Sequence, residues 1–304
     1  MKNKKIIIGS RGSKLALIYA ERARAELLKN SEIGSIDIKK ITTTGDAITD
    51  VRLSEHGGKG LFCKTIEQEL LNNDIDIAVH ALKDMPTEES KGLLTNCFLE
   101  RNDPREILIS KKNKLLKDLA LGSLVGTSSF RREFQIKKIR EDLNCKLIRG
   151  NVDTRIKKLN DNLYDAIILS LAGVNSLGLS KNISQIFSTS EMIPSAGQGV
   201  VALQCRSDDD EISELLTKVN HQSTHNCIKA ERNVLKVLEG DCETAVGVFA
   251  TINNNIINLE AELFSLDGKK RFYLKSSEDI EKANELGIGM GKTLKKISNN
   301  AYKK

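Results

Sequence analysis

The sequence predicts two α/β domains followed by a smaller α+β domain. Strand-like and helix-like segments alternate through the first two-thirds of the chain, the alternation restarts near residue 123, and the pattern changes after Arg206. A chain of 304 residues is also too long for one ordinary hydrophobic core. We expect the first domain to comprise residues 1–100 with 198–217, the second residues 101–197, and the third residues 218–304.

The first domain alternates buried strands with amphipathic helices. Short apolar runs predict strands, and apolar residues at every third or fourth position predict helices. The expected elements are strands at 4–10, 35–45 and 74–85 and helices at 13–30 and 61–73. The polar segment 42–60, which carries Lys59, fits no regular element. A mobile lid and an inert surface excursion are both consistent with its composition.

The second domain shows the same alternation of strands and helices. Strand–turn–helix segments are expected at 123–142, 145–162 and 164–179, and segment 200–206 reads as a strand that rejoins the first domain. Residues 126–129 open a helix much as residues 9–13 open the first helix of the chain. Ligands of such sheets bind outside the carboxyl ends of the strands. Two lobes that face each other therefore predict one cleft between them.

The third domain has a different pattern. Helical residues run through 225–240, alternating residues at 245–277 predict a meander with turns at NNN and DGKK, and 279–300 predict a closing helix. Cys242 lies at the junction between the first helix and the meander. This arrangement is typical of an α+β domain.

The composition is that of a soluble protein. It is 39% hydrophobic and 29% charged, with a mean hydropathy of -0.30, no membrane-spanning run and no leader, which favours the cytoplasm. The six cysteines form no CxxC or Cys/His cluster, which argues against a metal site and a disulfide framework. The net charge of +6 is scattered, aromatic residues make up 4%, and tryptophan is absent, so nothing supports a nucleic-acid partner.

The stretch VGTSSFRRE, residues 125–133, predicts an anion site at a helix N-terminus. Unpaired backbone N–H groups and the helix dipole favour an anion there. Ser128 or Ser129 could simply be an N-cap, but Arg131 and Arg132 indicate bidentate capture of carboxylate or phosphate. The predicted strand ends carry five arginines, and so many imply a ligand with several separated anionic groups: Arg11, Arg131, Arg132, Arg149 and Arg155.

Three other positions are candidates for chemistry. Asp84 and Lys83 end a predicted buried strand; Asp84 could shuttle a proton or face a developing cation, although a surface ion pair is the commoner arrangement. His80 is at least as well explained as a satisfied, partly buried imidazole. Cys242 lies between two acids, which disfavours a thiolate, so it suits a single alkylation by a strong electrophile better than a conventional low-pKa nucleophile.

Together these residues resemble the hydroxymethylbilane synthase, or porphobilinogen deaminase, family along nearly the whole chain. The ordered blocks that carry the resemblance are GSRGSKLAL, GGKGLF, DIAVHALKDMPT, ERNDPRE, VGTSSFRR, RGNVDTR, LAGVNSLGL, PSAGQGVVALQCR and AERNVLKVLEGDC. The resemblance implies two α/β domains like those of periplasmic binding proteins and a smaller C-terminal α+β domain. It also implies a monomer.

The family links four porphobilinogen molecules head to tail, releases ammonia and frees hydroxymethylbilane. The resemblance implies a dipyrromethane cofactor attached through a thioether to Cys242. Each pyrrole carries an acetate and a propionate, so the growing chain is a ladder of carboxylates. Asp84 matches the catalytic acid, which assists loss of ammonia and stabilises the azafulvenium cation.

The remaining site residues follow from the same match. Cofactor-binding positions are Lys83, Thr127, Ser129, Arg131, Arg132, Arg155 and Gln198, and substrate-binding positions are Arg11, Ser13, Ser128, Arg149 and Lys59, the last in the family's mobile loop. No metal is implied. The chain departs from the usual family pattern at three places: Ser176 replaces a basic residue, Asp241 and Ala245 flank the cysteine in place of glycine and proline, and Gln204 replaces a frequent glutamate.

The main alternative is a small-molecule binding protein with two α/β lobes and no catalysis. That function leaves Asp84 and Cys242 without roles. A covalent adduct of two linked pyrrole units, absent after Cys242→Ala, distinguishes the enzyme from the binding protein.

Overall fold

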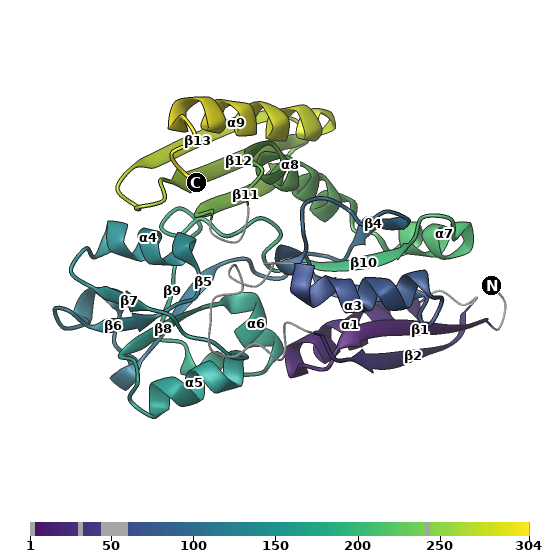
Figure 1. Ribbon diagram of the computed structural model, residues 1–304, viewed down its shortest axis with the longest axis horizontal. Helices are drawn as coiled ribbons and strands as arrows, with labels where there is room; N and C mark the ends of the chain where they lie inside the picture. Colours follow the sequence, from purple (N-terminus) through teal and green to yellow (C-terminus); the bar gives the residue numbers. More distant parts are fainter. Residues whose placement is uncertain (1–3, 30–32, 44–59, 241–243, 304) are drawn as a thin grey trace.

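The computed structural model describes residues 4–29, 33–43, 60–240 and 244–303. Figure 1 shows two α/β lobes side by side, with the C-terminal domain lying across them. The chain enters the first lobe, crosses to the second, returns to the first with β10 and then builds the C-terminal domain.

The first lobe is built on a mixed five-stranded sheet of order β2-β1-β3-β10-β4. Its strands are β1 (Lys4–Arg11), β2 (Ile33–Ile41), β3 (Ile77–Ala81), β4 (Leu93–Phe98) and β10 (Val201–Arg206). β1 pairs in parallel with β2 and β3, and β10 is antiparallel to β3 and β4. The carboxyl ends of β1 and β3 therefore meet at one edge of the sheet, as the sequence pattern requires for a site there.

Helices cover both faces of this sheet. They are α1 (Lys14–Leu27), α3 (Gly60–Leu71) and α7 (Asp210–Val219). Ile6 and Ile8 pack with α1 and α7, whereas Ile7 packs in the cluster formed by α3. This alternation follows from the two-residue period of a strand, and it buries the apolar run of β1 on both faces.

The second lobe repeats the topology with the order β7-β6-β8-β5-β9. Its strands are β5 (Glu106–Ser110), β6 (Leu124–Gly126), β7 (Asn144–Lys146), β8 (Ala166–Ser170) and β9 (Gln185–Ile186), and its helices are α4 (Phe130–Ile139), α5 (Val152–Asn160) and α6 (Leu171–Ser176). β6 is parallel to β7 and β8, while β5 is antiparallel to β8 and β9. β6 thus occupies the position that β1 occupies in the first lobe, which matches the sequence echo between 9–13 and 126–129.

The C-terminal domain is an antiparallel meander covered by two helices. Its elements are α8 (Gln222–Leu238), β11 (Val246–Asn253), β12 (Ile256–Phe264), β13 (Arg271–Asp279) and α9 (Ala283–Ser298). α9 packs closely on α8 because Gly287 has no side chain. A Cβ added there would lie 2.3 Å from the carbonyl oxygen of Ala230. Short 3-10 helices complete the chain: η2 (Leu82–Asp84), η3 (Lys111–Asn113), η4 (Leu116–Asp118), η5 (Ser180–Asn182) and η6 (Ile280–Lys282).

Two segments cross between the lobes: the first crossing is 99–105, between β4 and β5, and the second is 187–200, between β9 and β10. They lie against each other. The backbone N–H of Asn102 donates to the carbonyl of Gly199 at 2.9 Å. Gly199 has a φ of +83°, and a Cβ there would lie 2.5 Å from the Asn102 carbonyl oxygen, so only glycine suits this position. The lobes also meet through α1 and α6, where Leu15 contacts Gly173.

A buried carboxylate ties the crossing segments to the C-terminal domain. Glu231, on α8, is 0% exposed and accepts Arg101 Nη1 at 2.5 Å, Gly197 N at 2.8 Å and Ala250 N at 2.9 Å. These donors come from the first crossing, the second crossing and β11. One side chain therefore joins both crossing segments to the C-terminal domain.

The fold class predicted from the sequence is confirmed: two mixed α/β sheets are followed by a smaller antiparallel sheet with helices. The predicted return of 200–206 to the first sheet is also correct. Within the described part of the chain, no helix combines the length and the apolar character that crossing a membrane requires.

Candidate functional site

The predicted site residues that the structure describes gather near the carboxyl ends of the first sheet and the helix N-termini of the second lobe. Lys83 and Asp84 form the 3-10 turn η2 directly after β3. The turn is held by its buried neighbours Leu82 and Met85, and Leu82 N donates to the carbonyl of Val200 on the returning crossing at 3.0 Å. Lys83 and Asp84 are themselves half-buried.

A fully buried carboxylate, Glu106, organises the cationic side of the site. Its Oε1 accepts Arg131 Nη2 at 2.7 Å, and its Oε2 lies 2.8 Å from Arg132 Nη2, close enough for an ion pair although outside hydrogen-bond geometry. Burial alone would raise the pKa of Glu106, but the charges of Arg132, Arg131 and Lys83 outweigh it and lower the pKa to about 2. Glu106 is therefore ionised at neutral pH.

Gln198 connects this cluster to the first lobe. Its side-chain amide donates to Glu106 Oε1 at 3.0 Å and to the carbonyl of Pro104 at 2.6 Å. Its side-chain oxygen accepts Lys83 Nζ at 3.4 Å and lies 3.5 Å from Arg132 Nη2. Gln198 is 0% exposed, so this side chain fixes Lys83 of one lobe beside Arg132 of the other.

The cluster carries an excess of positive charge. Burial, and next the charge of Arg132, lower the pKa of Lys83 to about 8. Burial, Arg132 and Arg149 lower the pKa of Arg155 to about 10. The buried Nε of Arg132 has no hydrogen-bond partner among the described residues. Crowded cations and a buried donor without a partner are the chemistry of a site built for an anion.

Asp84 is close enough to both lobes to act on their charges. Its negative charge raises the pKa of Lys83 and of Arg155, and it contributes to the raised pKa of the buried Tyr19. Its carboxylate forms no hydrogen bond or ion pair with any residue that the structure describes. A carboxylate held among cations in this way can meet a positive charge on a ligand.

The hydroxyl groups of the site mostly bond the backbone. Ser129 caps α4 by accepting Arg132 N at 3.4 Å, and Ser13 caps α1 by accepting Ala16 N at 3.3 Å. The buried Thr127 hydroxyl accepts Ser129 N at 3.1 Å, and Ser128 donates to the carbonyl of Ile148. The N-cap alternative thus holds for Ser129, while the hydroxyls of residues 127–129 form one tight corner at the start of α4.

Two further arginines flank this arrangement. Arg149 is half-buried at the turn before α5, burial lowers its pKa, and its charge depresses that of Arg155. Arg11, at the end of β1, lies over the ring of Phe62 with 3.9 Å between the guanidinium carbon and the ring centroid. Both arginines therefore lie at the predicted strand ends.

Arg131 differs from the other arginines. It is 5% exposed, and its Nη1 donates to Gln135 Oε1 and to the carbonyl of Ile193, both at 3.0 Å, while Nη2 donates to Glu106. All of these partners belong to the protein itself. Arg131 lies in the predicted cluster, but its guanidinium is engaged within the fold.

His80 belongs to a separate buried network beneath the site. Its Nε2 lies 3.1 Å from Gln204 Oε1, and Gln204 Nε2 donates to Glu67 Oε1 at 3.1 Å. Burial lowers the pKa of His80 to about 4, so the imidazole is neutral at pH 7. The interpretation of His80 as a satisfied imidazole is the one that this geometry favours, and Gln204 bridges it to a carboxylate.

The cysteines divide into five described thiols and Cys242. Burial raises the pKa of Cys63, Cys97, Cys145 and Cys227 to about 12 and that of Cys205 to about 11. Thiols of this kind are poor nucleophiles. Cys242 and Lys59 lie outside the described residues.

Ser176, the departure from the family pattern in the second lobe, ends α6. Its hydroxyl donates to the carbonyl of Ala172 at 2.8 Å within the same helix. The side chain therefore supplies no cation at the junction of the lobes.

Sequence reasoning missed three contributors to this region: Glu106, Glu231 and Tyr19. Glu106 stands in the block ERNDPRE and Glu231 in AERNV, but an acid next to arginines usually reads as a surface pair. Only the packing of distant segments shows that both carboxylates are buried.

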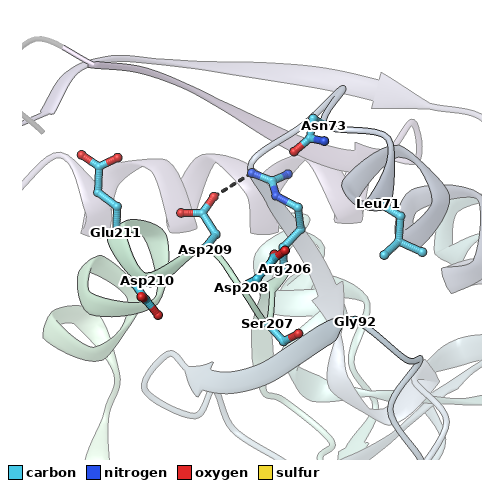
Figure 2. Close-up of a pocket in the computed structure, with 9 residues that line it drawn as sticks. All are labelled: Leu71, Asn73, Gly92, Arg206, Ser207, Asp208, Asp209, Asp210 and Glu211. Atoms are coloured by element: carbon cyan, nitrogen blue, oxygen red, sulfur yellow. Dashed lines mark hydrogen bonds and ion pairs between the residues drawn. The ribbon is translucent and has the colours of Figure 1, made fainter.

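A shallow depression of about 560 Å3 lies elsewhere, at the opposite edge of the first sheet (Figure 2). Arg206 on its wall donates to Asp209 at 2.7 Å and to the carbonyls of Leu70 and Ile75 at 3.0 and 2.8 Å. The guanidinium of Arg206 therefore bonds α3 and the start of α7 to the sheet. This depression is separate from the site described above.

The chain matches known proteins over most of its length. A family model described as porphobilinogen deaminase, dipyromethane cofactor binding domain, matches residues 6–214, and one described as porphobilinogen deaminase, C-terminal domain, matches residues 225–296. The chain is 42% identical to porphobilinogen deaminase of Chloroherpeton thalassium, covering 94% of this chain and 92% of the relative. It is 45% identical to that of Staphylococcus carnosus, covering 88% of each.

Solved structures that align with the chain include a methionine-binding protein and a lipoprotein. The methionine-binding protein MetQ aligns with a TM-score of 0.43 and 16% identity, covering 73% of this chain and 90% of that one. A YaeC-family lipoprotein from Enterococcus faecalis aligns with a TM-score of 0.43 and 14% identity, covering 71% and 91%. The two α/β lobes are instead defined by the strand orders of their own sheets.

Proposed function

The chain belongs to the porphobilinogen deaminase family, and from that premise we propose which of its residues carry the reaction. Its activity is that of the family: it converts porphobilinogen into hydroxymethylbilane in tetrapyrrole biosynthesis. The observation that supports the assignment of the site is the meeting of Asp84 and Lys83 of one lobe with Arg132 and Arg155 of the other.

The residues present fit the dipyrromethane cofactor of this family. The cofactor carries several carboxylates, and the site offers crowded cations and the buried Arg132 Nε that lacks a protein partner. We propose that the cofactor contacts come from Lys83, Thr127, Ser129, Arg132, Arg155 and Gln198, with Cys242 as its covalent attachment. Arg131 belongs to the same set but supports it from within the fold, because its Nη donors are taken by Gln135, Ile193 and Glu106. When bound, the cofactor supplies the primer to which pyrrole units are added.

The substrate would be held by the outer residues of the same arrangement. Porphobilinogen carries an acetate and a propionate, and guanidinium groups bind carboxylates in a bidentate manner. We propose that the substrate contacts come from Arg11, Ser13, Ser128, Arg149 and Lys59. Ser13 and Ser128 then contribute at helix N-termini, where the dipole also favours an anion.

Asp84 is the proposed catalytic residue. Its carboxylate assists the departure of ammonia from porphobilinogen, and its negative charge stabilises the cation left on the substrate as the carbon–nitrogen bond breaks. The same carboxylate then accepts the proton that is released when the new carbon–carbon bond forms. The charge of Asp84 in turn raises the pKa of Lys83 and of Arg155, so the carboxylate lies within electrostatic reach of cations from both lobes.

We further propose a cytoplasmic monomer, in which the three sheets mark three domains with the boundaries predicted above. The five described cysteines are free, as is usual in a reducing compartment. Light scattering after size-exclusion chromatography tests the monomer: a mass near 33.7 kDa agrees with it and a multiple contradicts it.

Intact-protein mass spectrometry tests the attachment at Cys242. The purified chain should carry a covalent adduct of two linked pyrrole units, and Cys242→Ala should remove it completely, because only a thiol at that position forms the thioether. Cys63→Ala is the matched control, since its buried thiol should leave the adduct in place. A bare polypeptide mass, with no ammonia released from porphobilinogen, would point to a binding protein instead.

The charge of Lys83 should depend on pH near neutrality. In the Cys242→Ala chain, which has no attached cofactor, Lys83 should lose its proton at about pH 8, because burial and Arg132 disfavour the charged amine. Below that pH the charged amine binds carboxylates, and above it this attraction is lost. Competitive acetylation across pH 6–11, followed by peptide mass spectrometry, measures the midpoint.

Lys117 serves as the internal reference for this measurement. It occupies the middle of η4, a second Leu-Lys-Asp 3-10 turn, and it is exposed. A Lys83 peptide that labels with the same pH dependence as the Lys117 peptide would contradict the proposed burial of the amine beside Arg132.

A further inference from the structure

Glu106 is a buried carboxylate that interacts with residues of the second lobe, of a crossing segment and of the first lobe. It is 0% exposed at the start of β5, immediately after the first crossing. One oxygen accepts both Arg131 Nη2 at 2.7 Å and Gln198 Nε2 at 3.0 Å, and the other lies 2.8 Å from Arg132 Nη2. The side chains of Arg131, Gln198 and Arg132 are therefore all positioned by the same carboxylate.

Arg131 is linked to the C-terminal domain through Gln135. Its Nη1 donates to Gln135 Oε1, and Gln135 Nε2 donates to Glu262 Oε2 on β12 at 2.8 Å. Arg131 and Gln135 are one turn apart on α4, so they lie on the same face of that helix. A continuous chain of hydrogen bonds therefore leads from β12 through Arg131 to Glu106.

Glu106 is also the buried negative charge on the cationic side of the site. Lys83 faces Arg131 and Arg132 from α4, Glu106 from β5, and Asp84 from its own turn. The two arginines lower the pKa of Lys83, whereas Asp84 and Glu106 raise it. Removing the charge of Glu106 would leave Lys83, Arg131 and Arg132 close together without the carboxylate that offsets their charges.

We propose that Glu106 is a positioning residue for the reaction: it holds the guanidinium of Arg132 and the amide of Gln198 beside Lys83, and Arg131 acts through Glu106 rather than on the ligand. This inference rests on the function proposed for the site and names a residue that the resemblance did not supply. It also gives the two neighbouring arginines different roles. Arg132 retains a buried donor for a ligand, whereas Arg131 gives its Nη donors to the protein.

Three variants test this role. Glu106→Gln keeps the shape of the side chain and removes its charge, and the new amide places donors against guanidinium donors. Glu106→Asp keeps the charge but is one methylene too short to reach both arginines. Glu67→Gln is the matched control: Glu67 is also buried and also accepts a glutamine amide, Gln204 Nε2 at 3.1 Å, but it lies in the separate network with His80.

The first readout needs no cofactor. In the Cys242→Ala background, the Lys83 midpoint measured by competitive acetylation should move to lower pH in Glu106→Gln, because a negative charge that raised the pKa has been removed. It should stay at the starting value in Glu106→Asp and in Glu67→Gln. A midpoint unchanged in folded Glu106→Gln would overturn the electrostatic part of the proposal.

The second readout uses the chain with Cys242 intact. Glu106→Gln and Glu106→Asp should both raise KM for porphobilinogen by about tenfold, the size expected when one charge-assisted hydrogen bond is lost, and reduce the fraction of molecules carrying the adduct. Glu67→Gln should change neither. A purely structural role would lower the melting temperature of Glu106→Asp and leave its KM at the wild-type value, and that result would sink the proposal.

Failure of the proposed function gives a different pattern. If the unmodified chain itself carries no adduct and consumes no porphobilinogen, the assignment of the site is wrong. The acetylation midpoints still compare Glu106→Gln with Glu67→Gln in that case, so the coupling of Glu106 to Lys83 is judged separately. If Glu106→Gln does not fold, the KM of Glu106→Asp decides the positional part.

Discussion

Replacing Asp84 with asparagine is expected to lower turnover of porphobilinogen by about 10²–10⁴-fold, the usual contribution of a positioned general acid or base. Asparagine fills the same space beside Lys83, but it neither transfers the proton nor offers a full negative charge to the substrate cation. Circular dichroism should show a folded chain, and intact-mass measurement should still find the adduct. Steady-state and single-turnover ammonia release measure the loss.

The chain contains its own control for this substitution. Asp118 ends η4 with the same Leu-Lys-Asp sequence and the same 3-10 turn as Asp84 in η2, but it is exposed on the second lobe. Asp118→Asn should therefore leave turnover unchanged. Wild-type turnover in Asp84→Asn would move the acid–base role to another group, and an equal loss in both variants would indicate an effect on the turn rather than on chemistry.

The fold was largely predictable because local patterns decide it. The two-residue and 3.6-residue periods of the chain placed most strands and helices, and the echo between 9–13 and 126–129 predicted that the lobes repeat each other. The pattern did not predict β4 or β5. β4 has mixed polarity (LLTNCF) and β5 begins with a charged residue (EILIS), and both become strands because they pair with β10 and β8.

The sequence pointed to residues that the structure brings close together, but it did not show the contacts between them. A glycine followed by hydroxyls and paired arginines predicts an anion site, and the structure places these residues together at the start of α4. The sequence could not say that Arg131 gives its Nη donors to Glu106, Gln135 and Ile193 while Arg132 keeps a buried donor. Those contacts join residues up to 62 positions apart, so no local pattern contains them.

Glu231 illustrates the same limit with a larger energetic consequence. It lies on α8 among residues with an ordinary helical pattern, yet it is 0% exposed and accepts hydrogen bonds from Arg101, Gly197 and Ala250. Arg101 in turn donates through Nε to the carbonyl of Gln198 at 2.9 Å. The carboxylate of Glu231 thus supports the crossing segments directly. Through Arg101 it also supports the backbone of Gln198, which is a site residue.

Replacing Glu231 with glutamine is accordingly expected to lower the free energy of unfolding by about 3–5 kcal/mol, because breaking a buried ion pair leaves the charge of Arg101 without its partner. Glu239→Gln is the matched control on the same helix: its carboxylate is exposed and pairs with Lys295 and Lys303, so it should matter far less. Urea denaturation followed by circular dichroism measures both variants. Equal stabilities for the two variants would mean that Glu231 does not hold the crossing segments to the C-terminal domain. A second transition in Glu231→Gln alone would show that the C-terminal domain then unfolds independently of the lobes.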